Sequence, residues 1–337
     1  MEHIRPASNS MHFKLENILN PLDLGGRDHV EFRLDREAGP IQVTLRKLNA
    51  QEIDKLSVAE QKYAPNFLKG ISTTEIYVSE SRQQKIHANK ASGTAKDIAR
   101  TQLIQLSSAL MCVLGAIRWF RALTAATDLI RIEGGLQYSL DGETWHHFPG
   151  QGTFSTGPMG AIKKNFDEKD MEIVKNIVAA RIEEPFGHEL LTEAWALATT
   201  KPRSALVIAI AAIETSYKEF LEVVDPGSKW LVAGEQAPAL ENLLRDELPT
   251  LNVRLKLANG TVAVTQYMLD VVKKCVSLRN LLVHGKKPHI KRDTVKELVE
   301  VARDILYLLD LYSGRAWAAD NICYSSKKVL REMDKQL

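Results

Sequence analysis

The chain has 337 residues, of which 45% are hydrophobic and 26% charged, and its formal net charge is +2. This length allows two ordinary domains with buried cores. The composition excludes a disordered or collagen-like chain. The small net charge excludes a globally basic nucleic-acid-binding protein, so any basic surface must be local.

Cysteine usage and apolar runs both favour a soluble cytoplasmic protein. Cys112, Cys275 and Cys323 lie far apart and form no CxxC pair, which is typical of a reducing compartment. The first residues lack the apolar core of a secretory signal peptide. The apolar runs at 103–120 and 205–213 fall short of the ~20 residues that a membrane span needs, so we expect buried helices and no membrane.

The first 150 residues carry mostly strand signals. Apolar and polar residues alternate at 30–34 and 39–48, and shorter strand signals lie at 75–78 and 128–132, as in half-buried strands. Residues 49–56 are predicted to be helical or turn-like, and helical spacing is found at 96–115. A hairpin is predicted at 136–148, because Asp141-Gly142 tolerates the positive φ of a tight turn.

The segment 150–160 is rich in Gly, Ser, Thr and Pro and is predicted to be a linker. Almost everything after it is predicted to be helical. The predicted helices cover 167–182, 187–198, 202–224, 237–248 up to Pro249, 262–284, a helix opened by a capping box at Thr294 and Glu297 that runs to about 312, and 326–333.

We therefore predict an α+β chain in three parts. Residues 1–150 form a mixed α/β domain that senses a trigger or restrains activity. Residues 165–325 form an all-helical domain, and residues 326–337 form a C-terminal helical tail.

Positive charge gathers at the end of one predicted helix. Between residues 271 and 303 the sequence holds nine Lys or Arg residues and three acidic residues. Cations near a helix C-terminus favour the helix dipole, so part of this charge could serve stability alone. A polyanionic partner is the other explanation.

Three residues in this stretch suggest phosphate chemistry. Asn280 and His284 share a helix face, whereas Arg279 lies about 140° round from His284 in a regular helix, at ~100° per residue. The two converge only if the helix loosens, which Gly285 allows. A His can take and give protons at neutral pH, and an Arg can hold a phosphate and stabilise its developing charge. Cleavage of RNA by its own 2′-hydroxyl requires these two roles and no metal.

The sequence RNLLVHG at 279–285 resembles the RxxxxH motif of the HEPN superfamily, and Apea-like HEPN domains are the most similar subgroup. The sequence AIAAIE at 209–214 resembles the helix that packs against that motif. The resemblance covers about residues 165–325. It implies an antiparallel helical bundle that forms a two-fold homodimer, with both motifs facing one cleft.

The resemblance also implies a metal-independent endoribonuclease without a cofactor. Arg279 would bind the scissile phosphate, His284 would act as acid or base, Asn280 would orient one of them, and Glu214 would contact Arg279. RNA would further bind the basic residues Lys286, Lys287, Lys291 and Arg292. Such proteins act as toxins or as effectors of defence against phage, with an antitoxin or another defence protein as a possible partner.

Two other interpretations are open. A non-catalytic HEPN-like module could bind RNA, a nucleotide or a protein through the same surface, or the domain could serve dimerisation alone. In the simplest view, His284 caps a helix, Arg279 forms a surface salt bridge, and Glu214 is a buried acid paired with a cation. The enzyme requires that Arg279 and His284 are exposed within reach of one phosphate.

Overall fold

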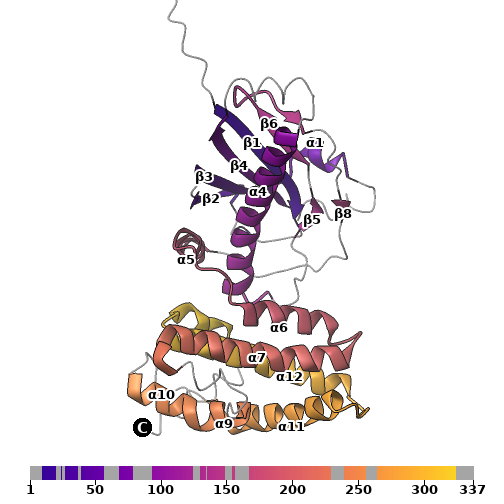
Figure 1. The fold of residues 1–337 in the computed structure, drawn as a ribbon, viewed down its shortest axis with the longest axis vertical. Helices are drawn as coiled ribbons and strands as arrows, with labels where there is room; N and C mark the ends of the chain where they lie inside the picture. The colour runs from indigo at the N-terminus through magenta and orange to yellow at the C-terminus, as the bar shows by residue number, and fades with distance from the viewer. Residues whose placement is uncertain are drawn as a thin grey trace, which may run out of the picture. The chain divides into compact units, whose positions relative to one another are not determined.

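The protein is α+β, and its computed structural model describes residues 10–19, 24, 27–36, 39–56, 68–78, 93–123, 130–133, 135–148, 154–155, 167–228, 239–255 and 264–323 (Figure 1). The chain divides into two compact units. The sheet unit consists of Met1–Arg118 and Asp128–Glu183, and the helical unit consists of Trp119–Thr127 and Glu184–Leu337.

This division differs from the expected boundary at 150–165. Helix α5 (Glu168–Ala179) packs against strand β2 and belongs to the sheet unit. Trp119 and Phe120, the last residues of helix α4 (Gly93–Phe120), belong to the helical unit. The predicted tail at 326–337 and most of the predicted linker lie outside the described residues.

The sheet has eight strands, and all of its pairings are antiparallel. Its path is β2-β3-β4-β1-β5-β8, and β6 pairs with β1 and with β7. The bounds are β1 Ser10–Leu19, β2 His29–Arg36, β3 Gly39–Lys47, β4 Leu68–Tyr77, β5 Ile130–Glu133, β6 Leu136–Ser139, β7 His146–His147 and β8 Phe154–Ser155. The alternation predicted in β2 and β3 is confirmed, since Val30, Phe32 and Leu34 are buried between exposed neighbours.

Strand β1 was not predicted, and strand β4 is longer than predicted. Strand β1 pairs with β4 along its whole length and buries Met11, Phe13 and Leu15. Strand β4 starts at Leu68, although the prediction covered only 75–78. Helix α4 lies across this sheet (Figure 1), and a Cβ on Gly70 would lie 3.0 Å from Leu110 of α4.

Helix α4 is also the one described helix with enough length and apolar character to cross a membrane, over Lys96–Phe120. Of its most apolar window, 56% is buried inside the protein. A core helix meets the same criteria, so this is weak evidence for a span.

Local caps fix the short elements around the sheet. Asn49 and Glu52 form a capping box on α1 (Ala50–Ile53), and a turn at Asp54 and Lys55 follows it, so the prediction of a helical or turn-like segment at 49–56 is confirmed. Asp167 and Asp170 form another on α5. The predicted hairpin is confirmed, with Gly142 at φ +79° between β6 and β7.

The helical unit is built around α7, which packs against α6, α11 and α12 (Figure 1). Its first half is buried along one face, while Val207 is exposed. The burial on nearly every face that its apolar sequence predicts is therefore not observed. The bounds are α6 Phe186–Leu197, α7 Pro202–Val224, η2 Pro226–Ser228, α9 Leu240–Asn242, the π-helical η3 Leu243–Glu247, α10 Leu248–Leu255, α11 Gln266–Val283, α12 Arg292–Tyr312 and η4 Ala316–Asn321.

Two predicted helix ends are wrong. Helix α12 begins at Arg292 without a side-chain cap, so Thr294 lies inside its first turn and forms no capping box. The helix predicted to stop at Pro249 continues through it as α10. The π-helical turn η3 comes directly before this proline, whose ring would clash with the Arg245 carbonyl in a regular helix.

A buried carboxylate holds the centre of the helical unit. Asp310 accepts hydrogen bonds from the Trp119 indole at 2.8 Å and from Arg315 at 2.8 Å, and lies 3.0 Å from Nε2 of His188. The Tyr307 hydroxyl donates to the Trp119 carbonyl oxygen at 2.7 Å. The last turn of α4 is thus tied into the core formed by α6 and α12.

Candidate functional site

Helix α11 ends at Val283, the residue before His284, and thus within one residue of its predicted end at His284. Gly285 has φ +76°, its N–H donates to the Leu282 carbonyl, and the Lys286 N–H donates to the Leu281 carbonyl. This is the Schellman arrangement, which needs a left-handed residue that glycine supplies without strain. His284 has φ −82° and ψ 20°, so it has left the regular helix, and its side chain is exposed.

Arg279 lies one turn earlier on α11 and is held by the central helix. Its Nη2 donates to Oε1 of Glu214 on α7 at 3.2 Å. The Arg279 side chain is 25% exposed and that of Glu214 is 36% exposed. The Arg279 Nε is buried and has no hydrogen-bond partner among the described residues. The guanidinium therefore retains an unused donor beside the ion pair.

These positions serve both the enzymatic and the simpler interpretation. His284 is exposed to solvent, but it is also the C-cap residue of α11. Arg279 is partly accessible, but it already has a carboxylate partner. Glu214 is half-exposed rather than a fully buried acid, and Asn280 is exposed beside Arg279.

The basic residues divide into paired and unpaired sets. On α11 and within α12, Lys273, Lys274, Arg279 and Arg303 each have an acidic partner. The residues around the loop between these helices are exposed and have no acidic partner among the described residues: Lys286, Lys287, Lys291, Arg292 and Lys296. The unpaired positive charge is thus concentrated directly after His284.

Helix stability explains only two of these five positive charges. Lys286 and Lys287 follow the C-terminus of α11, where cations are favourable. Lys291 and Arg292 are the N-cap and first residue of α12, where cations oppose the dipole. A helix N-terminus lined with cations instead favours a bound anion.

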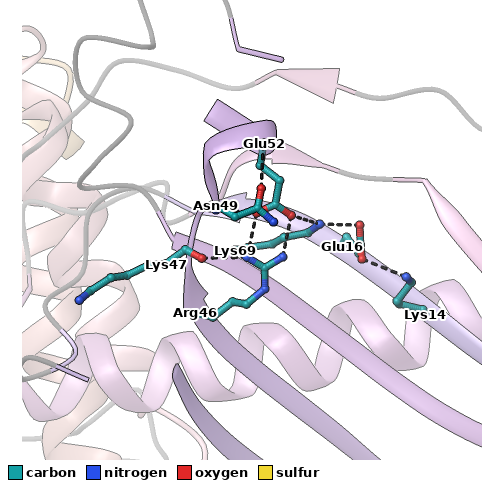
Figure 2. Close-up of polar contacts among 7 residues, drawn as sticks. All are labelled: Lys14, Glu16, Arg46, Lys47, Asn49, Glu52 and Lys69. Carbon is teal, nitrogen blue, oxygen red and sulfur yellow. Dashed lines mark hydrogen bonds and ion pairs between the residues drawn. The ribbon is translucent and has the colours of Figure 1, made fainter. Parts of the chain in front are cut away.

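A second polar cluster, which sequence reasoning missed, lies on the solvent-facing side of the sheet (Figure 2). Glu52 receives two hydrogen bonds from Arg46, at 2.6 and 2.8 Å, and one from Lys69 at 2.7 Å. Lys69 also contacts Glu16 at 2.8 Å, and Glu16 contacts Lys14 at 3.1 Å. We call these five alternating charges the sheet network.

The sheet network lowers the pKa of its central carboxylate, Glu52. Burial alone would raise the pKa of Glu52, but the hydrogen bonds from Arg46, Lys69 and the Asn49 backbone outweigh it and lower the pKa to about 2. Glu52 lies on α1, and the other four residues lie at outward positions of β1, β3 and β4. Knowledge of the strand order is therefore needed to find the cluster.

Among the described residues no group of three or more His, Cys, Asp or Glu side chains could hold a metal ion. No family model, no curated protein and no solved structure matches this chain.

Proposed function

We propose that this protein is a metal-independent endoribonuclease of the HEPN type, acting at the C-terminal end of α11 in the cytoplasm. The observation that carries the proposal is the unpaired basic segment 286–296, which follows an exposed His284 and a partly accessible Arg279. The segment would bind the RNA backbone through several phosphates.

In the proposed mechanism, Arg279 holds the scissile phosphate through the exposed part of its guanidinium, beside the contact with Glu214. The 2′-hydroxyl of the substrate attacks that phosphate, and the 5′-oxygen of the next nucleotide leaves. His284 transfers a proton in this step, and Asn280 orients His284 or the phosphate. The product ends are a 2′,3′-cyclic phosphate and a 5′-hydroxyl.

The test is cleavage of bulk cellular RNA in EDTA by the purified protein. His284→Ala should lower the rate by ~10²–10⁴-fold, and Arg279→Ala by ~10²–10³-fold. His147→Ala is the matched control, because His147 is also exposed but lies on β7, outside both the motif and the basic segment. Equal losses in His284→Ala and His147→Ala, or no cyclic phosphate ends, would contradict the proposal.

The ion pair between Arg279 and Glu214 supports a second candidate, a non-catalytic HEPN-like module that binds RNA. There Arg279 serves packing while the basic segment binds phosphates. RNA binding that falls steeply with salt, without cleavage by any variant, would favour this module over the enzyme.

The biological role that we propose is that of a toxin or an effector of defence against phage. Expression of the wild type should then arrest growth, whereas His284→Ala should not. An antitoxin or another defence protein would be the expected partner, and the helical unit the expected homodimerisation element.

A further inference from the structure

The sheet unit contains a cavity that the proposed ribonuclease site does not use. It has a volume of about 550 Å³ and lies over the solvent-facing side of β2, β3 and β4. Its floor is a row of three side chains, because Arg33 pairs with Gln42 and Gln42 pairs with Thr73 across the ladder. Small-molecule sites typically have volumes of about 300–1,000 Å³.

Trp145 forms an aromatic wall of this cavity, and local interactions hold it in place. Asp141 accepts hydrogen bonds from the backbone N–H groups of Glu143 and Thr144, which fixes the turn before Trp145. The ammonium of Lys14 lies 4.4 Å from the centre of the indole ring, as in a cation–π contact. Lys14 is the last member of the sheet network (Figure 2), so the wall exists before any ligand binds.

The charges around the cavity exclude a strongly charged ligand. Glu31 and Glu75 line it together with Arg33 and His12. Two carboxylates disfavour an anion, and the Arg33 guanidinium disfavours a cation, so the lining carries charges of both signs. The polar floor also disfavours a purely apolar ligand, which would leave its hydrogen-bonding groups unsatisfied.

Neutral hydrogen-bonding groups are free on the floor. Neither the Gln42 amide nor the Thr73 hydroxyl has a side-chain hydrogen-bond partner among the described residues. An amide offers donors and an acceptor, and a hydroxyl offers both. These groups lie beside the Trp145 indole. Together they are complementary to a ligand ring whose face is apolar and whose edge carries hydroxyl groups.

We propose that this cavity binds a sugar unit, which packs its ring on Trp145 and directs its hydroxyl groups to Gln42 and Thr73. The same chemistry is found in a free saccharide and in the ribose of a nucleoside. Glu31 and Glu75 accept further hydroxyl hydrogen bonds at the rim.

The test is an NMR titration of the full-length protein, following the indole N–H signal of Trp145, which its absence in Trp145→Phe identifies. The probes are glucose, cellobiose and uridine, added separately. A saturable shift with glucose or cellobiose identifies the ligand as a free saccharide. A saturable shift with uridine alone identifies it as a nucleoside. No saturable shift with any probe at ~20 mM, far above the ~1 mM affinity of a weak ligand, overturns the proposal.

Matched variants test the site itself. Gln42→Leu and Thr73→Val should each weaken binding by about 3–10-fold, the value of one hydrogen bond. Thr44→Val is the control, since Thr44 lies on the same side of β3 outside the cavity lining. Equal affinity in Thr73→Val and Thr44→Val would also overturn the proposal, because binding would then not involve the floor.

Discussion

At the scale of single residues, Glu52 and Lys69 of the sheet network each have more than one opposite partner. Glu52 is 16% exposed and contacts Arg46 and Lys69. Lys69 in turn contacts Glu16, which also contacts Lys14. A side chain that has two partners loses its conformational entropy only once while it forms two ion pairs. The exposed pair of Arg33 and Asp35, at 74% and 71% exposure, has no such support.

We expect Glu52→Gln to destabilise the sheet unit by about 1–3 kcal/mol at neutral pH, because Arg46 and Lys69 lose their shared charge. Asp35→Asn, the control, should change stability by less than ~0.5 kcal/mol. Urea denaturation followed through the Trp145 indole signal measures both. Equal effects of the two variants would contradict this view of the sheet network.

The same carboxylate predicts a pH dependence. The folded state lowers the pKa of Glu52 from 4.5 to about 2, so its stabilisation is complete above pH 4.5 and disappears as the pH falls toward 2. The difference in stability between the wild type and Glu52→Gln should therefore shrink over that window. A difference that stays constant down to pH 2 would show that charge is not the cause.

At the scale of elements, close approach of helices depends on single small residues. A Cβ on Gly187 of α6 would lie 1.9 Å from the Ser216 hydroxyl and 3.0 Å from the Ala212 carbonyl oxygen of α7. Glu219 of α7 also accepts hydrogen bonds from the Phe186 and Gly187 N–H groups at the start of α6. The two helices are thus fixed to each other at one point.

Gly187→Ala should therefore destabilise the helical unit by about 1–3 kcal/mol, although alanine favours a helix by ~1 kcal/mol over glycine. Adding Ser216→Ala should restore part of the loss, because it removes the nearest atom. Gly227→Ala is the control, since its nearest contact would be 3.6 Å away. Thermal unfolding monitored by circular dichroism measures all three, and an unchanged midpoint for Gly187→Ala would refute the packing argument.

Elements with a local signal could be predicted from the sequence. Asp141-Gly142 predicts its hairpin and Gly285 its helix end, because both are determined by backbone conformations that few residues adopt. Strand β4 could not be predicted in full, because Gly70, Ser72 and Thr74 face inward while Ile71 faces outward. Leu110 of α4 supplies the missing apolar volume over Gly70, and no local pattern records that. In β1, the buried Asn17 interrupts the alternation.

The candidate site follows the same rule. Arg279, Asn280, His284 and the basic segment are close in sequence, so a local pattern was enough to select them. The Glu214 contact joins residues 65 apart and was expected only through the resemblance. The cavity and the sheet network require the strand order, which long-range pairing determines.

At the scale of the whole molecule, the proposed ribonuclease would place motifs from two chains in one cleft. Arg279→Ala and His284→Ala, each inactive alone, should then recover part of the wild-type cleavage when mixed, because a mixed dimer retains one intact Arg279 and one intact His284. Cleavage of a labelled RNA by the mixture measures this. No recovery, although the variants exchange subunits, would mean that each chain acts through its own two residues.

The tie between Trp119 and Asp310 also constrains how the protein is made. These two residues are 191 positions apart, so at roughly 5–20 residues per second a ribosome needs roughly 10–40 s to reach Asp310 after Trp119. During that interval the indole lacks its hydrogen-bond partner. The helical unit therefore cannot complete its core until Asp310 has been synthesised.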